Sequence, residues 1–292
     1  NNYEFFESVP STDGLRAGDS TFDEIYIGFK PSEQWKVKLG RMQTKFELDG
    51  VAKKSLSRND SPNTDITWTD GLYAIYKGNN GWNLHTIIQY NSDEGASAVR
   101  RKPLNFSESG SRLTYYTGIE NKRKLGPIVQ RGFDISYLPD SLRKDGTALG
   151  EIENYWAIVG RMAAAWPIGK KQTKFLIGLE LGYAPNTPTE TSKSIGASDN
   201  TDGFAGQVTF NLVNFVPKHS VGLVVGRAGA GYLISPDFRE NTNLLELRYK
   251  WAIDKKQKIE ARIRRREDID QVTNSLQKRE DTDFYVRYTR KF

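Results

Sequence analysis

Basic side chains stand at alternate positions near the C-terminus, in a spacing that could attract anions. Lys258, Arg262, Arg264 and Arg266 share one parity, and Glu260 interrupts them. Alternate residues of a β-strand point to one face, so these side chains would form a ladder. Ladders of arginine and lysine raise the local concentration of anions, and the guanidinium fork binds carboxylate or phosphate through directed hydrogen bonds. The spacing therefore predicts a surface that favours anions.

Catalytic chemistry finds little support in the same sequence. The histidines are His85 and His219, and there is no cysteine. Neither histidine has another nearby to complete a histidine-rich metal site, and spacing singles out no acid–base pair among the acidic residues. We predict no enzyme, no metal site and no cofactor.

The elements that must position these residues are alternating segments of roughly ten residues, joined in turn by short and long connections. Residues 22–30 and 35–43 flank a turn at 31–34. Residues 66–77 and 82–90 flank Gly-Asn-Asn-Gly, a typical hairpin turn. The other alternating segments are 111–120, 127–138, 153–167, 173–184, 203–214, 219–228, 242–253, 258–266 and 281–292. With a short first strand near residues 3–6, we expect about 14 strands, and 16 are possible.

Tryptophans fall into two groups relative to these connections. Trp35, Trp82, Trp166 and Trp251 lie beside short turns, whereas others begin strands that follow long connections. Two belts of indole rings are typical of the two interfaces of a bilayer, because the ring has an apolar body and a polar N–H. The tryptophan positions thus favour a membrane-spanning sheet.

Composition agrees with a membrane barrel once the alternation is considered. Mean hydropathy is −0.63, and no stretch approaches the ~20 apolar residues of a spanning helix. A barrel places apolar residues at every second position and is polar on average. No amphipathic helices are expected that could cover a soluble sheet. We predict an all-β fold, a single transmembrane antiparallel up-and-down β-barrel over residues 1–292, with short periplasmic turns and longer extracellular loops. Because no signal peptide precedes Asn1, we expect a mature or trimmed chain.

Parity gives this barrel a basic interior. The residues predicted to line the pore are Lys36, Lys38, Arg161, Arg248, Lys250, Lys258, Arg262, Arg264, Arg266 and Arg287. Acidic residues of the same parity, including Glu246 and Asp283, leave two interpretations open. Either the cations create a water-filled channel that prefers anions, or the carboxylates neutralise them and brace the wall.

The end of the chain and two internal stretches resemble known families. A terminal Phe292 on an alternating strand resembles the closing strand of bacterial outer-membrane β-barrels, where it belongs to the signal read by the assembly machinery. Residues 39–43 read Leu-Gly-Arg-Met-Gln and residues 69–73 read Thr-Asp-Gly-Leu-Tyr. They resemble strands of phosphate-selective and alginate-export-type porins. The resemblance implies passive transport without a cofactor. Two possibilities stay open: the connection 45–64 enters the pore in part, or the channel is narrow and monomeric.

We therefore predict a porin of the bacterial outer membrane for the passive diffusion of small hydrophilic solutes, with a preference for anions. Expected partners are outer-membrane lipid, lipopolysaccharide, small anionic or neutral solutes, and the assembly machinery through Phe292. No nucleic acid is expected, because stacking aromatics are not interleaved with the basic residues. Cations of long connections, such as Lys53 and Arg101, could bind lipopolysaccharide or be solvated. The alternatives are the barrel domain of a polysaccharide or other exporter, in which a periplasmic domain or partner would accompany the barrel, and a docking or scaffold barrel for a partner protein.

Overall fold

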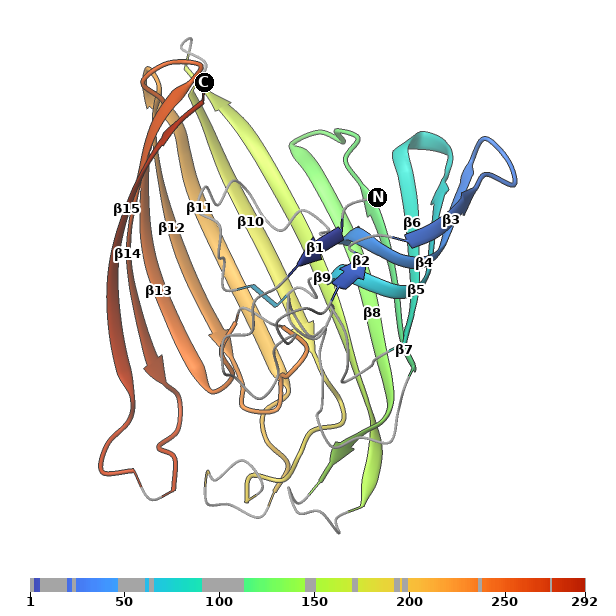
Figure 1. Cartoon of the computed structure of the whole chain (residues 1–292). Coiled ribbons are helices and arrows are strands. Elements are labelled where there is room, and N and C mark those ends of the chain that lie inside the picture. Colours follow the sequence, from blue (N-terminus) through green and yellow to red (C-terminus); the bar gives the residue numbers. More distant parts are fainter. Residues whose placement is uncertain are drawn as a thin grey trace.

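The main element is an antiparallel sheet of 13 strands, in which every strand pairs with its neighbours in sequence from β3 to β15. The computed structural model describes residues 3–5, 20–22, 25–46, 61–62, 66–90, 113–144, 151–169, 173–191, 195, 199–235, 238–273 and 275–291. The sheet curls around a concave face, with the short turns at the top of the view and the long connections at the bottom (Figure 1). The predicted all-β, up-and-down antiparallel architecture is confirmed.

The strands follow the alternating segments of the sequence. They are β3 (Ile25–Phe29), β4 (Trp35–Phe46), β5 (Ile66–Lys77), β6 (Trp82–Tyr90), β7 (Leu113–Asn121), β8 (Ile128–Arg143), β9 (Ile152–Ile168), β10 (Thr173–Tyr183), β11 (Phe204–Val216), β12 (His219–Ala228), β13 (Thr242–Trp251), β14 (Gln257–Asp268) and β15 (Glu280–Arg290). A single 3-10 turn, η1 (Asn79–Gly81), joins β5 to β6. In η1 the backbone of Asn80 is left-handed, with a φ of 58°, as a tight hairpin requires.

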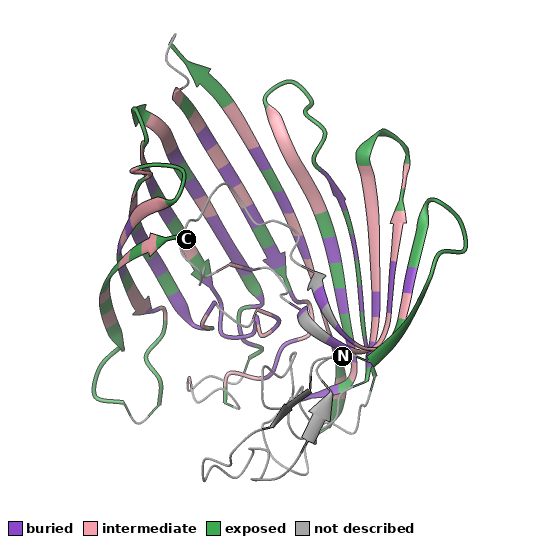
Figure 2. Ribbon diagram, turned by 45° about the horizontal axis from the view of Figure 1, so that its top comes forward, coloured by how far each residue is buried: buried purple, intermediate pink, exposed green. Residues whose placement is uncertain are grey.

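Burial alternates along the strands and separates an inner from an outer face (Figure 2). On β7, Thr114 and Tyr116 are buried, whereas Tyr115 and Thr117 are exposed. Strand register carries this parity from one strand to the next, so the inner face is continuous. The outer face exposes large apolar side chains such as Leu245, at 52%. Rows of exposed apolar residues of this kind suit contact with lipid.

Aromatic side chains gather on the outer face beside the short turns. The rings of Trp35 and Tyr76 are 4.9 Å apart, and those of Trp166 and Phe175 are 6.3 Å apart. Trp251 ends β13 at the short turn that leads to β14. These pairs form a belt at the level where an indole meets lipid headgroups.

Two glycines turn the hairpin of β4 and β5 away from the wall. Gly40 and Gly71 are register partners with φ values of 128° and 157°. A Cβ on Gly40 would lie 2.4 Å from the carbonyl oxygen of Ile25, and one on Gly71 would lie 2.0 Å from that of Ile88. Only glycine fits at such a close approach of two backbones. Beyond this corner β4 and β5 still pair with each other and bend toward the concave side (Figure 1).

We call residues 41–46 and 66–70 the inner ribbon. Its register partners Arg41 and Asp70 form a two-point ion pair, with Nε–Oδ1 at 2.7 Å and Nη2–Oδ2 at 3.1 Å. Met42 and Ile66 are buried in one cluster with inner-face side chains such as Tyr116. The stretches 39–43 and 69–73 therefore build a strand corner, its ion pair and its hydrophobic contact with the inner face.

A second element that the sequence did not predict also covers the inner face. The connection 229–241, which we call the inner segment, places Tyr232 and Phe238 over β10 and β12. A Cβ on Gly182 would lie within 2.3 Å of the Tyr232 hydroxyl, and one on Gly226 would lie 3.1 Å from the Phe238 ring. Both aromatic side chains are buried in the larger hydrophobic cluster of the protein. Glycines on the wall thus make room for the aromatic residues of the inner segment.

The first strand expected from the sequence is not part of the main sheet. The strand expected near residues 3–6 exists as β1 (Tyr3–Phe5), but it pairs with β2 (Ser20–Phe22) in a separate two-stranded sheet. The terminal Phe292, Lys53 and Arg101 lie outside the described residues.

The part of the chain that the structure describes contains no helix long and apolar enough to cross a membrane.

Candidate functional site on the inner wall

Seven of the ten residues predicted to line the pore lie on β13, β14 and β15, on the inner face. They form the basic wall, which consists of Arg248, Lys250, Lys258, Arg262, Arg264, Arg266 and Arg287. Strand register aligns them in rows. In one row Lys250 stands opposite Glu260, which stands opposite Arg287, and in the next Arg248 stands opposite Arg262. The spacing seen in the sequence therefore becomes a two-dimensional array of cations.

Carboxylates within the array hold several of these cations. Asp283 accepts hydrogen bonds from Arg262 at 3.0 Å and from Arg264 at 2.7 Å. The other ion pairs are Lys258–Glu260 at 2.8 Å, Arg287–Glu260 at 2.7 Å and Arg248–Glu246. These three carboxylates pair with five of the seven cations of the wall, so the array keeps a positive excess. The wall therefore contains both the cations of the one interpretation and the bracing carboxylates of the other.

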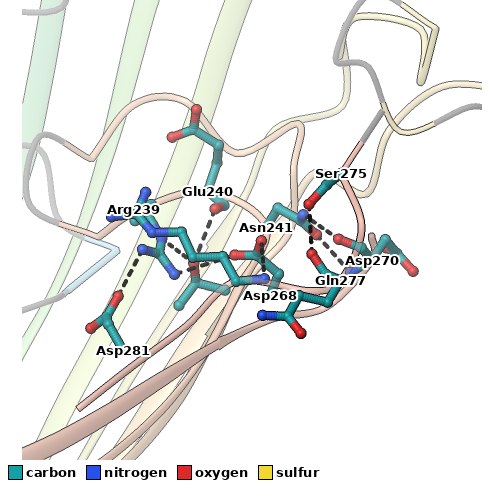
Figure 3. Close-up of polar contacts among 10 residues, drawn as sticks. Arg239, Glu240, Asn241, Asp268, Asp270, Ser275, Gln277 and Asp281 are labelled. Carbon is teal, nitrogen blue, oxygen red and sulfur yellow. Dashed lines mark hydrogen bonds and ion pairs between the residues drawn. The ribbon is translucent and has the colours of Figure 1, made fainter. Parts of the chain in front are cut away.

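The long-connection end of the wall has its own network. Arg239 donates to Asp281 at 2.9 Å and to Asp268 at 3.2 Å (Figure 3). Next to it, Asn241 donates to the carbonyl oxygen of Asp270 at 2.8 Å. These contacts fasten the C-terminal end of the inner segment to β14 and β15. The acidic residues at this end therefore have a cation of the inner segment as their partner.

The three remaining predicted residues lie apart from the basic wall. Arg161 on β9 is buried and forms an ion pair with Asp134 on β8. Lys36 and Lys38 lie on the inner face of β4, and the Lys38 ammonium is 3.9 Å from the centre of the Tyr26 ring. In the strand order β4 and β14 stand near opposite margins of the sheet. The sequence parity thus assigns a shared face but does not bring all ten residues together.

The inner ribbon and the inner segment are linked by contacts that we call the inner latch. The Tyr232 hydroxyl donates to the carbonyl oxygen of Pro62, and the Ser235 hydroxyl donates to that of Ser61 at 2.6 Å. The Ser61 hydroxyl also donates to Glu180 on β10 at 2.8 Å. The connection between β4 and β5 therefore reaches across the inner face, and it meets the inner segment there.

Sequence reasoning missed the inner segment because a connection carries no alternation to interpret. The available signal was composition: residues 232–234 read Tyr-Leu-Ile, and Phe238 follows, in a connection between two strands. Apolar and aromatic side chains in a connection need a surface on which to be buried.

A cavity of about 460 Å³ opens on the inner face at the short-turn end, between β10 and β13. The described residues that line it include Lys174, Lys218, Arg248 and Lys250, and none of those lining residues is acidic. The side chain of Asn211 also lines it. The basic wall thus continues to the short-turn end as a positively charged recess.

The two histidines belong to polar and aromatic contacts of the wall. His85 lies on the inner face, with Nδ1 3.1 Å from the Tyr73 hydroxyl and Nε2 3.5 Å from Glu120. His219 lies on the outer face, with its ring stacked on Trp251 at 5.5 Å between centres. These positions suit packing and hydrogen bonding within the sheet.

No protein-family model matches the sequence, and no curated protein matches it. Solved structures do resemble it. OccK5 (OpdH) of Pseudomonas aeruginosa superposes with a TM-score of 0.60 at 11% identity, over 94% of this chain and 72% of that one. A BenF-like porin of Pseudomonas fluorescens Pf-5 superposes with a TM-score of 0.60 at 12% identity, over 95% of this chain and 69% of that one.

OccAB3 of Acinetobacter baumannii gives a TM-score of 0.59 at 12% identity, and the similarity covers 89% of this chain. The chain spans 64% of the length of OccAB3. These structures carry other names than the phosphate-selective and alginate-export-type porins that the two short stretches resemble. At such low identity the likeness concerns the backbone. The chain has the fold of a bacterial porin, as the alternation of its sequence predicts.

Proposed function

We propose that the protein is a porin of the bacterial outer membrane, through which small hydrophilic solutes diffuse passively and in which anions are preferred. The observation that carries this proposal is the basic wall on the inner face of a porin fold. Its cations exceed its carboxylates, and it faces the concave side rather than lipid. A positive excess along a water-filled path raises the local concentration of anions and lowers that of cations.

The ion pairs of the wall are compatible with this role. The carboxylates hold the guanidinium groups in place without removing the positive excess of the wall, and that excess attracts a passing anion. Asp283 and Glu260 hold the arginines in extended rows, which keeps side-chain motion from closing the path. Conduction also requires that no single site hold a solute too tightly, and partial neutralisation serves that requirement. Passage of this kind needs no covalent step.

The test is the zero-current potential of the purified protein in a planar bilayer under a KCl gradient. The wild type should show a zero-current potential whose sign indicates that chloride permeates more readily than potassium. Arg262→Gln with Arg264→Gln should weaken that preference, because it removes two positive charges without placing new carboxylates beside Asp283. Asp283→Asn should strengthen the preference, since it leaves both arginines and removes a negative charge.

Arg265→Gln is the matched control. Arg265 lies on the same strand but on the outer face, where it is 3.1 Å from Glu280. The Arg265→Gln substitution removes the same charge as one of the test substitutions and should leave the zero-current potential unchanged. Equal effects of Arg265→Gln and the inner-face variant would contradict a role for the basic wall. Folded protein without any conductance would instead favour a barrel closed by the inner latch, as in a docking or exporter domain.

A further inference from the structure

The two ends of the sheet differ in charge. The residues of the six short connections between β3 and β14 that the structure describes include seven lysines and arginines but two acidic residues. The described residues of the six long connections include four basic and six acidic residues. We call the described residues of the short connections together the basic rim. An excess of positive charge confined to one end creates a strong local attraction for anions.

The basic rim lies directly beyond the aromatic belt. Short turn 122–127 carries Lys122, Arg123 and Lys124, and turn 252–256 carries Lys255 and Lys256. Turn 252–256 follows Trp251 of the belt, and the Arg123 side chain of turn 122–127 reaches η1, which Trp82 follows. Indole rings at this position mark the headgroup level of a bilayer, so cations one turn further lie among the headgroups and their phosphates.

Several cations of this region are held in place by protein contacts. The Arg123 guanidinium donates to the Asn80 side chain at 3.1 Å, which joins two adjacent turns. The Lys218 ammonium donates to the carbonyl oxygen of Ile253 at 2.7 Å, which joins two more. A cation with a fixed position loses less conformational entropy when it binds an anion than a free side chain does.

An arginine on the outer face lies beside an indole ring. Arg131 on β8 has outer-face parity, and its guanidinium lies 5.1 Å from the ring centre of Trp82. A solute that moves along the inner face does not meet this side chain. A lipid headgroup against the outer face does. The combination of an indole and an arginine on the outer face therefore favours lipid over a passing solute.

We propose that the basic rim binds the headgroups of anionic phospholipids in the leaflet that surrounds the short turns, and that bound lipid stabilises the protein. The inference rests on the proposed position in a bilayer and goes beyond the proposed channel function. The phosphate and the net negative charge of the headgroup are the recognised chemistry. Because the attraction of each lysine or arginine to an anionic surface adds to that of the others, several rim cations together suffice for preferential binding.

The test compares thermal unfolding of the reconstituted full chain in vesicles of phosphatidylcholine and in vesicles that also contain phosphatidylglycerol. The wild type should unfold at a higher temperature with phosphatidylglycerol. The variant Lys124→Gln, Lys255→Gln, Lys256→Gln removes three of the seven rim cations that the structure describes. It should lose about a third or more of that lipid-dependent shift, because headgroup attraction is roughly additive per cation. These side chains are exposed, so the change spares packing.

The matched control is Lys144→Gln, Lys278→Gln, Arg279→Gln at the long-connection end, which should keep the full shift. Glycerol phosphate added to phosphatidylcholine vesicles should not reproduce the rise in unfolding temperature of the wild type. Equal unfolding temperatures in both lipids, an equal loss in the control, or full reproduction by glycerol phosphate would each overturn the proposal. Conductance measured in pure phosphatidylcholine tests the channel function separately, because that measurement contains no anionic lipid.

Discussion

Asp283 illustrates at the residue scale what the sequence could and could not predict. Alternation alone places Arg262, Arg264 and Asp283 on the inner face. It does not reveal that a single carboxylate bridges two arginines of the neighbouring strand. That contact depends on register, which aligns Arg264 with Asp283, and on two rotamers. Residue parity is a property of the sequence, whereas pairing is a property of the assembled sheet.

Asp254 gives a residue-scale prediction for pH. Its carboxylate accepts hydrogen bonds from the backbone N–H groups of Lys256 and Gln257, both at 2.7 Å. The hydrogen bond from Lys256 is the main reason why the pKa of Asp254 lies below its usual value. The ionised form is thus favoured by folding, so its stabilisation is present above the unfolded pKa and is lost as pH falls through the folded pKa.

We therefore expect Asp254→Ala to unfold more easily than the wild type at neutral pH. The difference in unfolding temperature between the two proteins should shrink as the pH falls below about 4, the usual pKa of an aspartate. Thermal unfolding measured across an acidic pH series checks this. A difference that stays constant down to the most acidic point would show that the turn, rather than the charge, is responsible.

At the scale of elements, the inner ribbon was only half predictable. The strands of the β4–β5 hairpin follow the predicted segments, because their alternation is regular. The corner was not predicted, because Gly40 and Gly71 lie within that alternation and only their alignment across two strands shows the close approach. Partial entry of the connection 45–64 was one of two possibilities, and its described residues Ser61 and Pro62 contact Glu180 and Tyr232 on the inner face.

Tyr155 gives an element-scale prediction for the inner segment. Its hydroxyl donates to the carbonyl oxygen of Gly231 at 3.0 Å and accepts from the N–H of Leu233 at 2.7 Å. Tyr155→Phe removes both hydrogen bonds, each worth about 0.5–1.5 kcal/mol, and leaves a buried N–H without its acceptor. We expect the inner segment to loosen, which should raise single-channel conductance and its fluctuations.

The control for this change is Tyr137→Phe, the same substitution on the outer face of β8. It should leave the conductance unchanged. A Tyr155→Phe channel with wild-type conductance and noise would show that the inner segment does not limit the path. Single-channel recording of both variants under one set of conditions decides between these outcomes.

At the scale of the whole molecule, the fold was the most predictable feature. Strand periodicity, short and long connections in turn, and exposed apolar rows each follow from the physics of a sheet in lipid. Structural neighbours with 11% and 12% identity share this fold, so the pattern rather than particular residues encodes it. The inner ribbon and inner segment fill the concave side through specific contacts, which no periodic pattern specifies.

The unequal charge of the two ends has an electrical consequence for a channel. A basic rim at one mouth and an acid-rich set of connections at the other make the path asymmetric along its length. Ions driven from opposite sides meet these charges in opposite order, so their accumulation inside differs with the direction of the field. We expect the open channel to behave as a weak diode, with unequal currents at equal voltages of opposite sign. Adding concentrated salt should abolish the inequality, because it screens the charges of both mouths.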